Sequence, residues 1–211
     1  MTSGLDENLD LVLLTDGGHI ENLGIYELLR RRCKLIIAVD AEADPAMQFN
    51  SLISLERYAR IDLGIRIELP WSGIAETTSA IMAANTKREK LPKEQKGPHA
   101  ALGKIYYDDG SVGHLLYLKS SLSGDENDYI RDYAARNPSF PHETTADQFF
   151  SEEQFEVYRA LGFHAAHGVL SRDASVAFLD QNGDCQLAPL PLAGDAGTTE
   201  GASMTVRILG L

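Results

Sequence analysis

The sequence has few of the features that mark secreted, membrane-spanning or zinc-stapled proteins. Of its 211 residues only Cys33 and Cys185 are cysteine, and neither belongs to a CxxC pair. This excludes a disulfide framework and a cysteine-based zinc site. No apolar run approaches the ~20 residues that cross a bilayer, and residues 1–10 lack the basic and apolar regions of a secretion signal. We therefore expect a cytoplasmic protein.

Positive charge is scarce as well. The chain has 19 Lys and Arg residues against 31 Asp and Glu residues, a net charge of −12. Nucleic acids and anionic lipid surfaces both require a basic face on their partner. We therefore expect no nucleic-acid partner, and any contact with lipid has to be apolar or supplied by another part of the protein.

The first forty residues predict an α/β fold. Residues 11–15 form a short apolar run that is closed by Asp16-Gly17-Gly18, which is typical of a buried strand followed by a tight turn. A helix is predicted over 22–32, because this stretch lacks proline and ends in basic residues that the helix dipole favours. A second apolar run at 35–39 completes a predicted βαβ unit with parallel strands.

Weaker patterns follow this unit. We expect a helix near 46–59 and, from strict alternation over 61–69, a strand near a sheet edge. Residues 86–98 are polar and contain two prolines, which indicates a surface loop. Asp109-Gly110 suits the tight turn of a β-hairpin over 103–119.

The rest of the chain is expected to be helical and acidic, then loose. Residues 125–156 carry nine acidic side chains against two arginines, a net of −7, which is typical of a solvated helical surface. Beyond residue 183 the composition turns to Ala, Gly, Thr and Pro. The predicted organisation is an α/β part over 1–122, an acidic helical extension over 123–182 and a loose tail over 183–211.

Asp16 is the strongest candidate for chemistry. It follows a predicted central strand, and the catalytic groups of open α/β sheets gather at the carboxyl ends of their strands. A carboxylate held there can accept a proton from a hydroxyl nucleophile, and Gly17 and Gly18 let a loop or substrate approach without a Cβ clash. Asp-Gly-Gly is also ordinary turn chemistry, so this tripeptide alone is a weak signal.

A longer string strengthens the assignment. The sequence around Asp16, LTDGGHIENLGIYELLRRRC over 14–33, closely resembles the aspartate segment of bacterial patatin-like phospholipases. The resemblance extends over roughly residues 11–165, through DAEADP at 40–45, RIDLG at 60–64, LYLKSSLSGDE at 116–126 and FPHETTADQFF at 140–150.

The resemblance implies the function of a lipid acyl hydrolase. It implies part of a three-layer α/β/α sheet and hydrolysis of phospholipids or other acyl esters by a Ser/Asp dyad without cofactor or metal. Asp16 matches the dyad aspartate, which deprotonates the serine and later activates water, while backbone amides stabilise the oxyanion. Gly17, Gly18, His19 and Asn22 match the turn and the side chains that support it.

One part of the family pattern is missing. No GxSxG nucleophile motif occurs in the sequence, and the family places its serine and oxyanion glycines before the aspartate. We therefore expect a truncated or split half that does not turn over esters alone. The serine half would act in cis or in trans, and peripheral membrane contact is expected through that missing part. The competing hypothesis is a non-catalytic remnant that binds a protein partner.

Metal sites find little support in the local sequence. Asp16, His19 and Glu21 share no helix or strand face, and their spacing favours a supporting role in the turn. The segment 40–44 resembles the start of a calcium loop, but Pro45 stands where that loop needs glycine. His164 and His167 are three residues apart with no carboxylate motif beside them, so we expect no metal there either.

Overall fold

A six-stranded mixed sheet forms the centre of the protein. We describe it in a computed structural model, for residues 17–89, 96–144 and 146–190. The sheet order is β1-β4-β3-β5-β6, and β2 pairs with β3 alone. β1 and β4 are parallel, as are β3 and β5, whereas the other neighbours are antiparallel. The strands are β1 (Leu35–Asp40), β2 (Arg66–Glu68), β3 (Ala100–Tyr106), β4 (Val112–Lys119), β5 (Val176–Leu179) and β6 (Cys185–Ala188).

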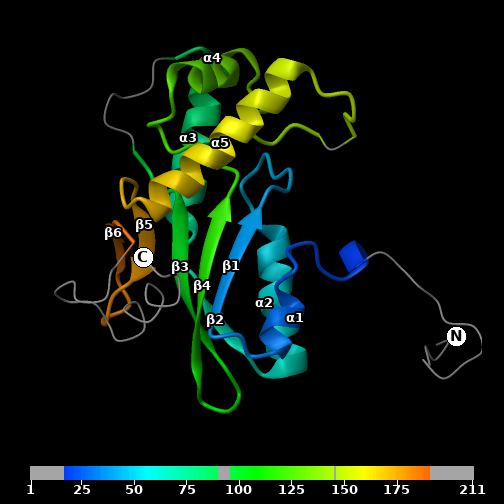
Figure 1. Cartoon of the computed structure of the whole chain (residues 1–211), viewed down its shortest axis with the longest axis vertical. Helices are drawn as coiled ribbons and strands as arrows, with labels where there is room; N and C mark the ends of the chain where they lie inside the picture. Colours follow the sequence, from blue (N-terminus) through cyan, green and yellow to red (C-terminus); the bar gives the residue numbers. More distant parts are fainter. Residues whose placement is uncertain (1–16, 90–95, 145, 191–211) are drawn as a thin grey trace, which may run out of the picture.

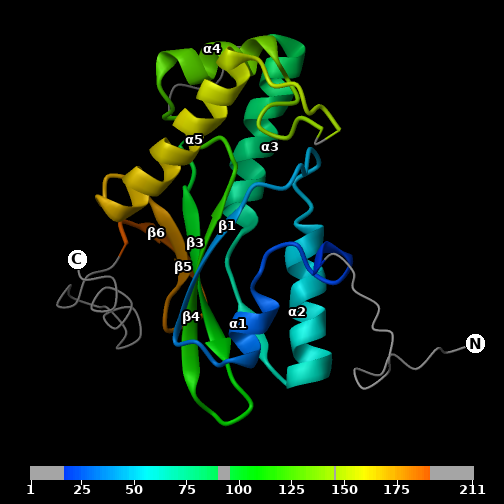
Figure 2. The same ribbon diagram turned by 45° about the vertical axis from the view of Figure 1, so that its right-hand side comes forward.

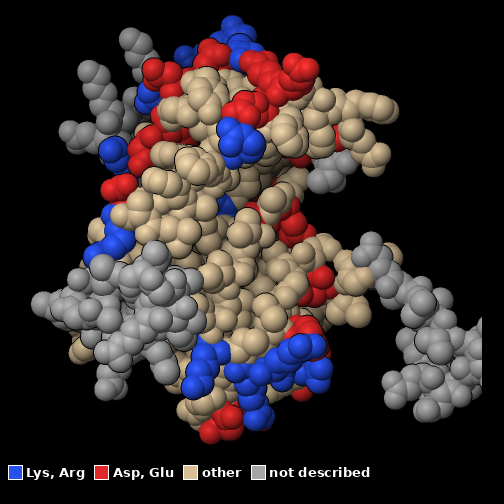
Figure 3. All heavy atoms as spheres, in the orientation of Figure 1, with Lys and Arg blue, Asp and Glu red and all other residues tan. Residues whose placement is uncertain are grey.

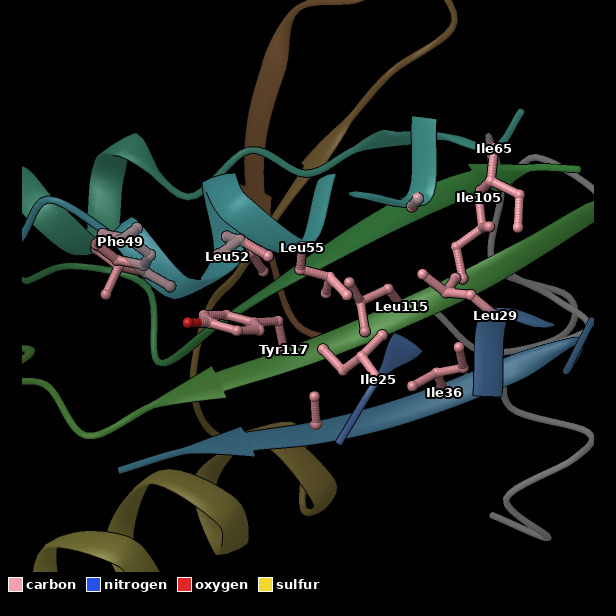
Figure 4. Close-up of a cluster of buried hydrophobic side chains, with 14 of the residues drawn as sticks. Ile25, Leu29, Ile36, Phe49, Leu52, Leu55, Ile65, Ile105, Leu115 and Tyr117 are labelled. Atoms are coloured by element: carbon pink, nitrogen blue, oxygen red, sulfur yellow. The ribbon is translucent and has the colours of Figure 1, made fainter. Parts of the chain in front are cut away.

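Helices cover the two faces of this sheet unequally. On one face, α1 (Tyr26–Arg30) and α2 (Asn50–Leu63) pack on β1, β4 and β3. Figure 4 shows this core, in which Leu52 and Leu55 of α2 lie over Leu115 and Tyr117 of β4. All four side chains are almost completely buried, and burial of each leucine stabilises the fold by roughly 1.5–3 kcal/mol.

On the other face, the end of α5 (Glu152–Leu170) covers β3, β4 and β5. Val169 of α5 packs with Leu116 and Leu118 of β4. These two side chains alternate along the strand with Leu115 and Tyr117, which point to the first face. The start of α5 joins α3 (Ser72–Lys87) and α4 (Asp128–Arg136) around Phe140 in a separate apolar cluster. Figures 1 and 2 show these three helices together at the upper end of the molecule. The predicted α/β class and helical layers on both faces are thus present.

Several local predictions are confirmed. Residues 35–39 lie in β1, which runs parallel to β4, and the hairpin of β3 and β4 turns at Gly110, whose φ of 83° is positive. β2 lies at an edge, as expected. The first predicted strand, residues 11–15, lies outside the described residues, as do 90–95 of the predicted loop.

Other predicted boundaries are wrong. α1 has five residues rather than eleven, because Gly24 has a φ of 68° and the Glu21 carboxylate binds the amides of Ile25 and Tyr26. α2 begins four residues late, after Asp44 has accepted hydrogen bonds from the amides of Gln48 and Phe49. It continues to residue 63, so the strand predicted over 61–69 shrinks to 66–68.

The carboxyl-terminal third also differs from the prediction. The described residues between α4 and α5, 137–144 and 146–151, form no helix. The segment expected to be a helical extension contributes β5 to the main sheet, and residues 185–188, expected in the tail, form β6. Both strands follow from pairing with β3 and its neighbours, which short local patterns do not reveal. Residues 191–211 lie outside the described part.

The basic residues at the end of α1 are paired within the chain. Arg30 and Arg31 contact Glu27, while Arg32 reaches Asp108 and Asp109 in the hairpin turn. Figure 3 shows positive charge gathered at this lower end, and negative charge interspersed with positive charge over the upper helices. These pairings agree with a helix terminus rather than a binding patch.

No helix in the described ranges is long and apolar enough to cross a membrane.

Candidate active-site edge of the sheet

The turn that follows Asp16 lies on the surface. Gly17–His19 form a short 3-10 helix, η1, and its three residues are exposed. The amides of Ile20 and Glu21 donate to the carbonyl of Gly17, at 2.9 and 3.0 Å, which closes the turn. Figures 1 and 2 place η1 near the start of α2. Asp16 itself lies outside the described residues.

A hydrogen bond ties this segment to the carboxyl end of β1. Asn22 Nδ2 donates to Glu42 Oε1 over 2.8 Å, and Glu42 stands two residues after the end of β1. Glu21 binds the amides at the start of α1, and its contact with the amide of Leu23 measures 2.5 Å. Asn22 therefore links the turn to the strand end, and Glu21 links it to the start of α1.

A buried ion pair occupies the ends of β1 and β4. The parallel register pairs Asp40 with Lys119, and Lys119 Nζ lies 2.9 Å from Asp40 Oδ2 with both side chains at most 2% exposed. Tyr117 Oη donates to the same oxygen, and the amide of Glu42 donates to Oδ1 over 2.8 Å. Burial and the Asp40 charge raise the pKa of Tyr117 far above its usual value, so it stays a donor. This network stabilises the strand ends.

His142 packs beside the ion pair as a neutral ring. The amide of Asp44 donates to its Nδ1 over 3.2 Å, so the ring proton is on Nε2. Burial lowers the pKa of His142 to about 4, and the charge of Lys119 contributes. His142 therefore supports the 40–45 loop as an uncharged residue at neutral pH.

An apolar pocket opens at the same strand end. It has a volume of about 310 Å³ and lies between Ala41, just beyond β1, and the 141–158 region, where Phe150, Phe155 and Tyr158 line it. Phe150 and Phe155 are 55% and 64% exposed, and the neighbouring Phe149 is 96% exposed. Such a concentration of exposed aromatic rings is uncommon unless the surface meets an apolar partner.

Within the described ranges, one face and one edge of β1 are also open. β1 ends the sheet order, with β4 as its strand neighbour among the described residues. Ile37 and Val39 lie in register with Leu116 and Leu118, on the face that α5 covers over β4. They are nevertheless 47% and 73% exposed, because α5 does not extend over β1. An open parallel edge with an apolar face is a surface for a further strand or domain.

A second group of side chains meets away from this turn. Nε2 of His99, just before β3, and Nε2 of His164, in α5, each lie 2.9 Å from Oδ1 of Asp125. His164 and then His99 hold the pKa of Asp125 well below its usual range, and Asp125 in turn raises the pKa of His164. No local sequence pattern reveals this group, because His99 and His164 are 26 and 39 residues away from Asp125.

The predicted site residues are thus brought together in part. Gly17, Gly18 and His19 form the exposed turn, and Asn22 links it to the sheet. His19 and Glu21 do not belong to the group of potential metal ligands found among the described residues, and neither does His167.

Comparisons with known proteins add no family assignment: no family model, curated protein or solved structure matches the chain.

Proposed function

We propose that this chain is the aspartate-bearing part of a patatin-like serine acyl hydrolase. A single observation carries the proposal: the 14–33 string and its exposed Gly17–His19 turn, tied through Asn22 to the carboxyl end of a parallel strand. Active sites of open α/β sheets form at this edge. The proposal assigns acyl-ester hydrolysis to the complete enzyme, with phospholipids and related esters as substrates.

In this proposal Asp16 is the general base. Its carboxylate takes the proton of the serine as that hydroxyl attacks the ester carbonyl and then passes the proton to the departing alkoxide, which leaves as the alcohol while the acyl-enzyme forms. The same carboxylate then activates the water that hydrolyses the acyl-enzyme. The exposure of Gly17 and Gly18 supports this role, because neither has a side chain to obstruct a serine-bearing loop.

The apolar pocket suits the acyl chain of such a substrate. Phe150, Phe155 and Tyr158 line it together with Ala41. The neighbour of Ala41, Glu42, accepts the hydrogen bond that Asn22 donates from beside the turn. An apolar pocket beside a polar catalytic turn matches the two ends of a fatty acyl ester.

The open side of β1 suits the serine-bearing part. A parallel strand beside β1, which the predicted βαβ unit expects from residues 11–15, would continue the sheet toward the serine-bearing part, and the exposed Ile37 and Val39 would lie beneath the added layer. Burial of these two side chains would contribute roughly 1–3 kcal/mol each to the association.

The test is esterase activity of the full natural polypeptide, measured with p-nitrophenyl butyrate and with phospholipid vesicles. We expect Asp16→Asn to lower kcat by roughly 10²–10⁴-fold without changing the thermal unfolding temperature. Asp128→Asn is the matched control, because the Asp128 side chain is 97% exposed; it should leave kcat unchanged.

Labelling with a fluorophosphonate probe separates the alternatives. We expect the natural polypeptide to be labelled at a serine upstream of Asp16. Near-full activity of Asp16→Asn would overturn the assignment of the base. Absence of both labelling and activity, in the natural polypeptide and in any chain that copurifies with it, would instead favour the non-catalytic interaction remnant.

A further inference from the structure

We propose that His99, Asp125 and His164 bind a divalent transition metal ion, with zinc as the best fit. The site is separate from the turn at Asp16 and does not depend on the proposed hydrolase function. Two imidazole nitrogens and one carboxylate oxygen form a common ligand set for zinc and for non-haem iron.

The three ligands come from different parts of the fold. His99 immediately precedes β3, Asp125 follows β4, and His164 lies in the middle of α5. Their donor atoms all lie within 4.8 Å of one another, and the two imidazole rings have centroids 4.8 Å apart. The sheet and the helical layer therefore fix the group from opposite sides.

The distances are close to those that a metal ion needs. A tetrahedral zinc ion with bonds of ~2.0–2.1 Å places its ligand atoms about 3.4 Å apart. The two nitrogens now lie 2.9 Å from Asp125 Oδ1. A movement of about 0.5 Å by each side chain would therefore open the space for the ion. Ser123 Oγ, 2.9 Å from the same Oδ1, helps to orient the carboxylate.

Charge and hydrogen bonding also favour an ion. Nε2 of both imidazoles now contacts the same carboxylate oxygen, and one divalent ion between them would bind all three groups. His99 is 2% exposed and its Nδ1 has no hydrogen-bond partner among the described residues. A proton can therefore move from Nε2 to Nδ1 without breaking a bond there, which frees Nε2 to bind the metal.

A pocket beside the group provides space for a further ligand. It has a volume of about 350 Å³, and Tyr129, Phe163, His167 and Asp173 line it together with the three proposed ligands. Three protein ligands and an open fourth position are typical of zinc sites that hold water or a small anion. His164 is 29% exposed, so an ion can reach the site from this pocket.

The experiment is a metal titration of the full natural protein after treatment with a chelator. Cobalt(II) serves as the coloured probe, and zinc is then added in competition. We expect one cobalt ion per chain with visible ligand-field absorption, displacement by zinc, and a rise in the thermal unfolding temperature with zinc. His164→Ala and Asp125→Asn should each weaken binding at least a hundredfold.

His167→Ala is the matched control, because His167 lines the same pocket from the same helix but stacks on Phe163. It should bind cobalt as the unaltered protein does. Binding below one ion per chain, or unaltered affinity in His164→Ala, would overturn the proposal. Circular dichroism and thermal unfolding of metal-free His164→Ala establish that its fold is intact. We expect an intact fold because the His164 side chain is partly exposed. Because this experiment measures metal binding and not ester hydrolysis, its outcome is independent of the test of Asp16.

Discussion

Removal of the buried cation beside Asp40 should destabilise the protein strongly. Lys119 and Asp40 are 1% and 2% exposed, and their charged atoms lie 2.9 Å apart. In Lys119→Met the Asp40 carboxylate keeps hydrogen bonds from Tyr117 and Glu42 but loses its counter-charge. An unpaired buried charge costs about 3–5 kcal/mol of unfolding free energy. For a protein of this size the expected fall in unfolding temperature is roughly 6–20 °C.

Thermal and urea unfolding, followed by circular dichroism, measure this effect. Asp40→Asn combined with Lys119→Met removes both charges and should recover most of the lost stability. Arg159→Met is the control, because it breaks an exposed ion pair with Glu156 and should leave the unfolding temperature unchanged. The cost assigned to the unpaired Asp40 charge is refuted if Lys119→Met has the same unfolding temperature as Arg159→Met. It is also refuted if the double variant is no more stable than Lys119→Met.

Two further predictions concern the pH dependence of stability and the replacement of glycine by alanine. The pKa of His142 is lowered from 6.5 to about 4 by burial and by Lys119, so the unfolded chain takes up a proton that the folded one does not. The unfolding free energy should therefore fall by about 3 kcal/mol as pH drops from 6.5 to 4, and His142→Gln should lack this part of the slope in urea titrations. Gly103→Ala should cost about 2 kcal/mol or more, because its Cβ would lie 2.5 Å from the Glu68 carbonyl oxygen. Gly162→Ala, with no atom within 4 Å of the added Cβ in α5, should instead stabilise by about 0.5–1 kcal/mol in the same assay.

Local signals predicted the elements whose determinants lie within a few residues. The apolar run at 35–39 identified β1, and Asp109-Gly110 identified the hairpin, because a tight turn depends on positive φ at a residue such as Gly110. The end of α2 was less predictable. Alternation over 61–69 suits a strand, yet the helix continues to Leu63 and stops where Gly64 adopts a φ of 67°.

The α/β class, the turn chemistry around Gly17 and the resemblance behind the proposed dyad aspartate all follow from the amino-acid sequence alone. The contact between Asp40 and Lys119 does not, since it requires the parallel register of β1 and β4. The tertiary structure decides that contact, and it also decides that His99, Asp125 and His164 share one pocket. Side chains on one helix face recur in the sequence at a fixed spacing, which a pattern can reveal, but residues from separate elements share no such spacing. Their distances depend on how the sheet and the helices pack.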